Sequence, residues 1–475
     1  MQGLKSDKAK IQTWREKAKK YRGEKQALKS RLKEVIEGRS KWREKHRQTQ
    51  LEIKCLRKEL ACKKTQLRGV SKGHKYDCFI VSLSLWLRQN SSCSLRSCQK
   101  ILRLLILILE LEHQFPSHTS ISNWEKKLGY YRVFEKPSSS GDWVIIIDES
   151  ITVGQQKMLL ILGVNLADYK FGQAVKFEDV EVLDFGIQKS WKGEAIDERL
   201  KGITSKGVNI LYCVCDGGNN LCKSLKISQI IRVEDCTHAI GKLLEKQYKD
   251  KEEFVKFSRE CVGFKRRKMQ SEIAFLIPPT QRSKGRFLNL EPLAKWAREW
   301  ILFMKKVAKK RKSPVWLTEI EWLKEYEQMV EKIYTDCQVM HQLFKIIKHQ
   351  GLSEKTAAVC RNILDKSSAT DFFKTGVLKY LENNLNKLGE GTSLICTSDI
   401  IESFFGKLKN RLSLNKEIGL TDSCLTIANF TKDADCSEIK KAMEEVKIVD
   451  IKNWRNENLE VNLIQKKKEV FKNAG

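Results

Sequence analysis

Residues 143–149 read WVIIIDE, five apolar residues followed by two acids, and this stretch decides how the rest of the chain is interpreted. A short, continuous apolar run of this kind predicts a strand that is buried on both faces. We therefore expect a strand over residues 143–147 that ends at Asp148. Glu149 would point to the opposite face of a strand, so we expect no metal role for it.

The pattern on the C-terminal side of this strand alternates between strands and helices. We expect strands at 158–166 and 180–187, a helix at 193–205, a strand at 208–215, a helix at 219–226, a strand at 229–233 and a helix at 236–248. The order is βββαβαβα, with Asp148 and Asp216 at the ends of the first and fourth strands. This order resembles the layout of a ribonuclease-H-like α/β domain.

A third acid lies on an amphipathic helix over residues 397–411, TSDIIESFFGKLKNR, which contains Glu402. Two Mg²⁺ ions about 3.5–4 Å apart require several carboxylate ligands, and three such acids would supply them. One metal would activate an attacking water or 3′-hydroxyl, and the other would stabilise the leaving oxygen of a phosphodiester. Taken singly, Asp148 could be a strand-end cap and Glu402 an ordinary surface acid.

Residues 143–411 resemble a DDE transposase of the Mutator-like group and its bacterial insertion-sequence relatives. The matching residues are Asp148, Asp216 in CVCDGG, the Asp-x-x-His signature from Asp235 to His238, and Glu402. Asp216 follows Asp148 by 68 residues, and Glu402 follows Asp216 by 186. One departure is Asp399, where relatives often carry Asn. Asp399 is the alternative candidate for the third acid, for which we expect Glu402.

The resemblance implies roles for these residues. Asp148, Asp216 and Glu402 would bind two Mg²⁺ ions, for which Mn²⁺ would substitute, and His238 would join them as a catalytic residue beside the metals. Lys409 would hold a DNA phosphate, and we expect Lys407 and Arg411 of the same helix at the DNA as well. An ordinary helix-face histidine is the alternative for His238.

The net charge of +30 over 475 residues, from 89 Lys and Arg against 59 Asp and Glu, favours a polyanionic partner such as nucleic acid. Half of this surplus lies in residues 1–68, which hold 23 basic and 8 acidic residues. From Ile11 to Leu60, apolar residues recur at alternating steps of three and four, which predicts a dimeric coiled coil. A solvated coiled coil without a DNA ligand is the alternative.

Residues 76–134 read as a compact helical unit. A long apolar helix over 94–112, a turn at 115–117 and a short helix over 119–128 that stops at Gly129 have the pattern of a helix-turn-helix. In that interpretation Asn123 and Lys126 would face a DNA groove, together with Ser120 and Ser122. The alternative is a helical hairpin that only packs on the scaffold.

The remaining regions complete the expected organisation. Residues 249–396 are helical and basic, and their tryptophans at 296, 300, 316 and 322 could either stack on bases or form a core. The expected parts are a coiled coil at 1–70, a helix-turn-helix-like unit at 71–137, a catalytic domain at 142–248 plus 397–415, an all-α insertion at 249–396 and a C-terminal helical tail at 416–475.

The sequence also bears on compartment. It contains no apolar stretch as long as the roughly 20 residues of a membrane span, and its N-terminus has no secretory pattern. The 15 cysteines are scattered, so we interpret them as reduced; a zinc site around Cys213, Cys215, Cys222, Cys236 and His238 is the less favoured alternative to simple burial. We expect a cytoplasmic or nucleoid location in a bacterial host and a nuclear one in a eukaryote.

Together these features predict a transposase that binds the ends of its element and target DNA, as a homodimer or higher oligomer, and carries out metal-dependent strand cleavage and transfer. Three alternatives remain: a domesticated, non-catalytic DNA-binding protein, a ribonuclease-H-like nuclease without strand transfer, and a basic coiled-coil scaffold. Retention of all three acids and of His238 argues against the first.

Overall fold

The computed structural model describes most of the chain. The described residues are 21–22, 25–26, 29, 32, 35–55, 73–108, 114–135, 141–151, 156–281, 286–307, 314–387, 389, 393–412, 420–461 and 463–473. They divide into two units, one from residues 1–70 with 77–79 and the other from 71–76 with 80–475.

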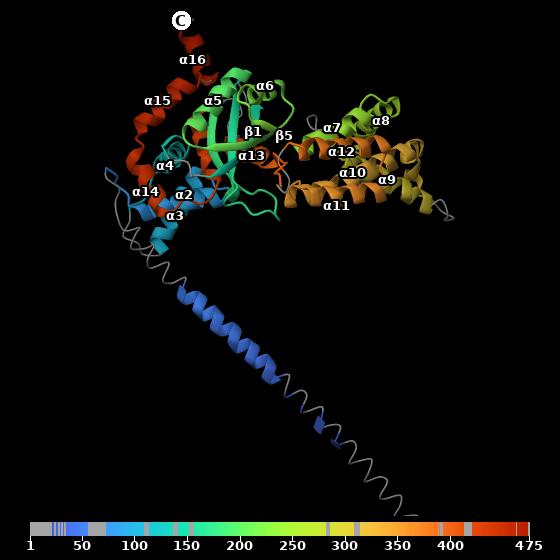
Figure 1. The fold of residues 1–475 in the computed structure, drawn as a ribbon, viewed down its shortest axis with the longest axis horizontal. Coiled ribbons are helices and arrows are strands. Elements are labelled where there is room, and N and C mark those ends of the chain that lie inside the picture. Colours follow the sequence, from blue (N-terminus) through green and yellow to red (C-terminus); the bar gives the residue numbers. More distant parts are fainter. Residues whose placement is uncertain are drawn as a thin grey trace, which may run out of the picture. The chain divides into compact units, whose positions relative to one another are not determined.

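Residues 35–55 of the first unit form a helix (Figure 1), and the side chains of this helix are exposed. Apolar residues of the expected heptad seam lie open to solvent, with Val35 65%, Trp42 67% and Ile53 36% exposed. An open seam is what a helix requires in order to pair with a second helix. Pairing itself stays a prediction, and seam positions 11, 14, 18, 28, 56 and 60 lie outside the described residues.

The second unit is built on a five-stranded mixed sheet. Its strands are β1 (Asp142–Ile151), β2 (Lys157–Asn165), β3 (Glu181–Gln188), β4 (Asn209–Cys215) and β5 (Ile231–Glu234). Their order across the sheet is β3-β2-β1-β4-β5. β1 pairs antiparallel with β2 and parallel with β4, so the central strand is enclosed on both edges.

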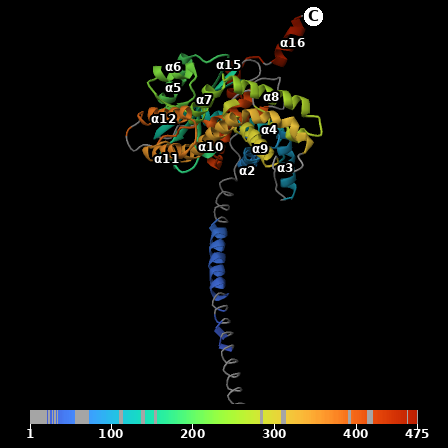
Figure 2. The ribbon, with the colours of Figure 1, turned by 90° about the vertical axis from the view of Figure 1, so that its right-hand side faces the viewer.

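Three helices alternate with the later strands: α5 (Gly193–Ser205), α6 (Asn219–Ile227) and α7 (Cys236–Tyr248). α5 and α6 lie side by side (Figure 2) and pack on one face of the sheet. The result is a mixed α/β arrangement that is compatible with the ribonuclease-H-like core expected from the sequence.

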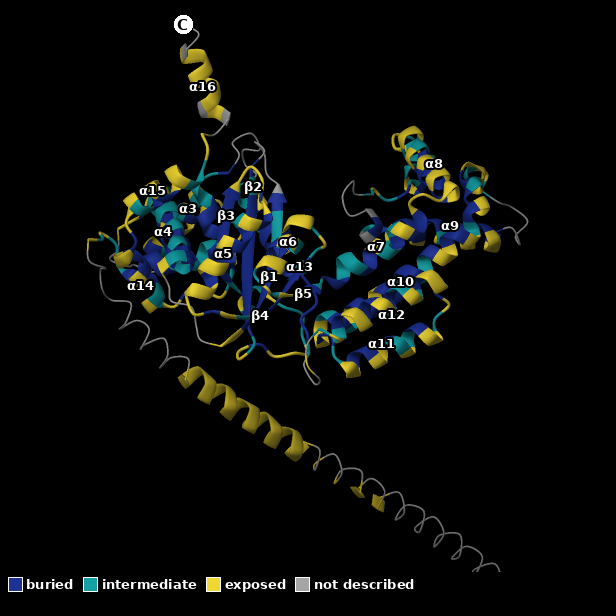
Figure 3. Ribbon diagram, turned by 45° about the horizontal axis from the view of Figure 1, so that its top comes forward, coloured by how far each residue is buried: buried dark blue, intermediate teal, exposed yellow. Residues whose placement is uncertain are grey.

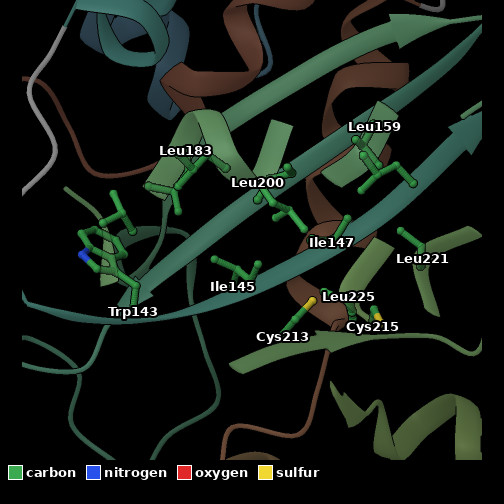
Figure 4. Packing of buried hydrophobic residues seen from close by; sticks show 14 of the residues in the cluster. Trp143, Ile145, Ile147, Leu159, Leu183, Leu200, Cys213, Cys215, Leu221 and Leu225 are labelled. Atoms are coloured by element: carbon green, nitrogen blue, oxygen red, sulfur yellow. The ribbon is translucent and has the colours of Figure 1, made fainter. Parts of the chain in front are cut away.

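The core on that face is formed by alternating strand residues. Trp143, Ile145 and Ile147 of β1 point into it together with Cys213 and Cys215 of β4 (Figure 4). Both cysteines are completely buried among apolar side chains, which favours burial over a zinc site for them. Because side chains alternate along a strand, Asp148 lies on the face opposite to this core.

The expected end of the first strand was wrong. β1 continues through Asp148 to Ile151, because β2 stays paired with it, Asp148 opposite Leu160 and Ile151 opposite Lys157. The carboxylate therefore projects from within a strand, where the ladder holds its backbone on both sides of the residue. The other elements of the domain match their expected positions to within two residues.

The N-terminal helices of the second unit are α2 (Cys78–Asn90), α3 (Leu95–Ile108) and α4 (His118–Tyr130). α4 does not stop at Gly129, as the sequence suggested, but continues into a π-helical turn, η1 (Tyr131–Glu135). Gly129 has a different purpose: a Cβ there would lie 2.0 Å from the carbonyl oxygen of Leu425. The glycine permits close approach of another segment to this helix.

That segment belongs to the C-terminal part of the chain, which contains the 3-10 helix η7 (Asp422–Phe430), α14 (Cys436–Glu445), α15 (Ile448–Asn458) and α16 (Leu463–Asn473). η7, α14 and α15 all pack against α4. Side chains along α4 are consequently buried, namely Ile121, Trp124, Glu125, Lys127 and Leu128. This burial favours the packing alternative for α4 over insertion into a DNA groove.

The described residues between 252 and 385 are helical or irregular. The helices are α8 (Glu252–Lys268), α9 (Glu291–Val307), α10 (Glu327–Gln350), α11 (Glu354–Lys366) and α12 (Asp371–Leu385), with 3-10 segments η3 (Ala274–Leu276), η4 (Arg286–Asn289) and η5 (Val315–Tyr326). α13 (Asp399–Leu412) follows, and η2 (Phe177–Asp179) precedes β3. The part of the basic run 305–312 after Val307 lies outside the described residues.

The four tryptophans of the helical region pack on one another and on neighbouring aromatic rings. Trp296 and Trp322 have ring centroids 6.4 Å apart, and Trp300 and Trp316 5.8 Å apart. The Trp296 indole also donates to the Leu276 carbonyl oxygen at 3.1 Å. These contacts account for the tryptophans as packing residues.

Burial is concentrated along the strands, whereas the described residues of α16 are exposed (Figure 3). None of the described helices is both long and apolar enough to cross a membrane.

Candidate active site

Asp148 and Asp216 lie next to each other towards the C-terminal ends of the two neighbouring strands β1 and β4. β1 and β4 run parallel, and Ile146 pairs with Val214 in their register. Asp148 follows Ile146 by two residues in β1, and Asp216 follows Val214 by two residues, directly after β4. Because side chains alternate, each acid lies on the same face as the apolar residue two places before it. Strand register thus brings the start of the loop at Asp216 beside Asp148 of β1.

Each of these carboxylates is anchored by one backbone amide. Oδ1 of Asp148 accepts a hydrogen bond from the Glu149 N–H at 2.7 Å, and Oδ1 of Asp216 accepts one from the Gly218 N–H at 2.8 Å. No hydrogen-bond donor reaches the second oxygen of either acid among the described residues. One oxygen of each acid is therefore left for a ligand.

Asp235 organises the next part of the site. It is 1% exposed and caps α7, where its Oδ1 accepts from the His238 N–H at 2.6 Å and lies 3.1 Å from Nδ1 of the same imidazole. Its Oδ2 accepts from the N–H of Ser398 at 2.5 Å and from the Ser398 hydroxyl at 2.9 Å. One buried carboxylate thus connects the histidine to the segment that leads into α13.

Glu402 reaches the site from α13. Ile401 and Phe405 lie on the buried side of this helix, whereas Glu402 has a 59% exposed side chain. Its Oε1 lies 3.8 Å from Nε2 of His238. The imidazole therefore stands between two carboxylates, Asp235 on one nitrogen and Glu402 on the other.

The electrostatics of the site reflect this crowding of acids. Burial raises the pKa of Asp148 to about 7, and the negative charges of Asp216 and Glu402 act in the same direction, while His238 opposes them. The hydrogen bond to Asp235 raises the pKa of His238 to about 9, with further contributions from Glu402 and Asp216. At neutral pH the imidazole is therefore a cation within a cluster of carboxylates.

Asp399, held in reserve for Glu402, has other partners. Its carboxylate accepts from the Thr237 hydroxyl at 3.1 Å and pairs with the Lys348 ammonium. This acid is occupied by contacts to α7 and α10.

Two cations at the site were not among the expected residues. A Cβ placed at Gly217 would lie 3.3 Å from Nζ of Lys242 and 3.7 Å from Nη2 of Arg232, so both side chains reach the loop after Asp216. Lys242 stands one helical turn after His238 on α7 and has no acidic partner among the described residues. The i, i+4 spacing from His238 is the sequence signal that could have identified it.

The expected DNA-binding residues of α13 separate into two groups. Lys409 is exposed, with its ammonium 5.9 Å from the Phe405 ring centroid. Lys407 is half-buried over the Phe177 and Phe430 rings. Arg411 has only 15% of its side chain exposed and lies 3.2 Å from Glu125, so it forms an ion pair with α4, and its DNA contact stays a prediction.

The expected groove-facing residues of α4 do not form an exposed set. Lys126 lies 2.9 Å from Asp422, with 15% and 21% of the two side chains exposed, so η7 provides its partner. Asn123 is half-buried. Neither residue is close to the carboxylates in any described contact, so the structure does not bring α4 into the site.

The carboxylate ligands favour metal binding, whereas their arrangement does not yet form a metal centre. Carboxylate oxygens are the ligands that Mg²⁺ prefers, and Asp148, Asp216 and Glu402 offer them beside one another. However, no three His, Cys, Asp or Glu side chains among the described residues converge closely enough to form a metal centre. Glu402 is turned towards His238, so completing a metal shell requires its flexible, exposed side chain to turn.

No protein family and no curated protein matches the sequence of this chain. Among solved structures, the chain is similar to the Drosophila P element transposase strand transfer complex, with a TM-score of 0.37 and 12% identity over 84% of this chain and 97% of that chain. At this level of similarity, the functional argument rests on the side chains described above, and the Mutator-like resemblance stays a prediction based on its motif residues.

Proposed function

We propose that this chain is a metal-dependent transposase that cleaves DNA strands and transfers a 3′-hydroxyl end to target DNA, with a ribonuclease-H-like βββαβαβα domain as its catalytic core. The observation that supports this best is the meeting of Asp148, Asp216, His238 and Glu402, which come from a strand, a strand end and two helices. In sequence, the first and last are 254 residues apart.

The charge of the cluster supports a role for divalent cations. Asp216 and Glu402 both raise the pKa of Asp148, and a divalent cation would stabilise a site formed by these three carboxylates. Asp148, Asp216 and Glu402 would hold Mg²⁺ or Mn²⁺. Such ions activate the attacking hydroxyl and stabilise the leaving oxygen of a phosphodiester.

The other residues would position the substrate. Asp235 holds His238 in the cationic form, which would keep Glu402 near the site and offer a charge-assisted hydrogen bond to a phosphate oxygen. Lys242 and Arg232, next to the loop after Asp216, would bind the same DNA strand. Lys409 extends this row of cations along the exposed side of α13.

The test uses the full chain and a plasmid that carries the DNA flanking its gene. Asp148→Ala, Asp216→Ala and Glu402→Ala should each reduce Mg²⁺- or Mn²⁺-dependent strand cleavage at least 100-fold while DNA binding is retained. Glu149→Ala is the matched control, because Glu149 is a neighbouring acid that pairs with Lys157 at 3.4 Å. It should cleave at the wild-type rate.

Product analysis separates the alternatives. Joined products with a second plasmid are expected for a transposase, whereas a nuclease without strand transfer gives cleavage alone. Wild-type protein that binds DNA but never cleaves it, with either metal, would identify a non-catalytic DNA-binding protein. Cleavage that survives in any of the three acid variants would disprove the assignment of that acid.

A further inference from the structure

A cavity of about 770 Å³ lies away from the carboxylates, between the end of α2, the starts of α3 and α4 and the last turns of α13. Five of its eleven lining residues are basic, and none of the eleven is acidic; the basic ones are Arg88, Arg96, His118, Lys407 and Arg411. We propose that this cavity binds the phosphate backbone of the DNA strand that passes through the Asp148–Asp216–Glu402 site. The inference rests on the proposed function and adds a second contact point to it.

The cations of the cavity exceed the acids that face them. Glu125 is buried and lies 3.1 Å from Arg88 and 3.2 Å from Arg411, so a single carboxylate serves two guanidinium groups. Arg96 and Lys407 have no acidic side chain within ion-pair distance among the described residues. Arg88, Arg96, Lys407 and Arg411 face two nearby acids, Glu125 and Asp433, which leaves a surplus of two positive charges that an anionic ligand would compensate.

The surroundings of Lys407 disfavour its positive charge. Burial lowers the pKa of its ammonium, and the neighbouring Arg411 lowers it further, with only Asp433 acting in the opposite direction. Burial also lowers the pKa of Arg411, with Glu125 opposing this shift and Arg88 adding to it. Side chains this close would repel one another less with a phosphate between them.

Two helix starts add to the same field. Leu95 is the first residue of α3, His118 is the first residue of α4, and both line the cavity. The start of a helix carries a partial positive charge, which favours a phosphate, while Ser94 and Ser117 each accept one N–H at these two starts. Here the two helix starts accompany side-chain cations around a defined cavity.

The position on α13 favours a DNA strand over a free nucleotide. Glu402 and Asn410 belong to the same helix, and eight residues of rise amount to about 12 Å, the length of three or four nucleotides of one strand. A strand whose phosphodiester lies at Glu402 would therefore reach the cavity within a few phosphates. Because both positions lie on one helix, the distance between them is fixed, and one DNA strand could contact both at a constant spacing.

The test measures how DNA affinity of the full chain depends on salt. Each phosphate contact contributes a slope of about 0.9 in log Kd against log salt concentration. Arg96→Ala should lower that slope by about 0.9 and weaken binding at low salt roughly 10-fold, because one phosphate contact is lost. Lys226→Ala on α6 removes an exposed cation outside the cavity and is the control; its slope should equal that of the wild type.

Three outcomes decide the inference, provided that thermal melting shows each variant to be folded. Arg96→Lys should restore most of the slope, whereas an unchanged slope in Arg96→Ala would overturn the proposal. Competition by ATP that affects the wild type but not Arg96→Ala would also overturn it, by assigning the cavity to free nucleotides. Asp148→Ala should bind with the wild-type slope, so loss of cleavage and loss of this contact are scored separately.

Discussion

Asp235 is the residue on which the geometry of the candidate site depends most. Its two oxygens receive four contacts, two from His238 and two from Ser398, and it is buried. Although burial alone would raise its pKa, the hydrogen bonds from His238 and Ser398 hold the pKa of Asp235 below its usual range. A buried anion of this kind fixes both the imidazole and the start of α13.

The charge of His238 gives a prediction. Asp235→Asn should lower the pKa of the imidazole from about 9 towards 6.5, measured by NMR titration. Because the folded-state pKa is raised, the stabilisation by His238 is complete below pH 6.5 and is lost as the pH rises through about 9. Ser398→Ala is the control, since it removes a donor to Asp235 but leaves the imidazole contact; a pKa that falls equally there would contradict this account.

The raised pKa of Asp148 gives a second prediction, for protein without metal. The folded state favours the protonated acid, so its contribution to stability is present below pH 3.8 and is lost as the pH rises through about 7. Asp148→Asn should therefore be more stable than the wild type at pH 8, by about 1–2 kcal/mol, and equally stable at pH 4. Mg²⁺ should raise the melting temperature of the wild type at pH 8 more than that of the variant.

At the scale of elements, α13 presents one of its cations to solvent and buries another against α4. α13 directs Lys409 outward, whereas Arg411 is drawn inward because Glu125 of α4 is buried beside it. Removing one partner of such a pair leaves an unpaired buried charge, which is costly. The two helices are therefore joined by a buried ion pair as well as by apolar contacts.

The close approach of η7 to α4 gives an element-scale prediction. Gly129→Ala should destabilise the fold by more than about 2 kcal/mol, because its Cβ would lie 2.0 Å from the Leu425 carbonyl oxygen and the backbone must move. Gly202→Ala in α5 is the matched control, since nothing lies within 4 Å of its Cβ. It should stabilise the protein by about 0.5–1 kcal/mol through helix propensity. Urea unfolding distinguishes the two.

At the scale of the whole molecule, the exposed seam of the N-terminal helix leads us to predict self-association. The double variant Val35→Glu and Trp42→Glu should shift the sedimentation coefficient from an oligomer to a monomer, because both residues are exposed seam positions. Gln48→Glu, off the seam, is the control for added charge. If the wild type already sediments as a monomer, the coiled-coil prediction is wrong.

Several features followed from the sequence by itself. Apolar runs such as 143–147, and alternation of strands with helices, are local patterns, so the strands and helices of the α/β domain were predicted to within a few residues. An acid that directly follows an apolar run is also a local pattern, so Asp148 and Asp216 could be identified from the sequence. The Asp-x-x-His signature also singled out Asp235 and His238 in the sequence, and the structure adds that Asp235 caps α7.

Only the tertiary structure decided which side chains are open to a ligand. Lys126 has the same exposed-cation pattern in sequence as Lys409, but Asp422 reaches it from a distant segment. The sequence did not identify Lys242, because its position beside Gly217 depends on how α7 packs. Charge and periodicity are properties of neighbours in sequence, whereas pairing and burial depend on contacts between residues far apart in the chain.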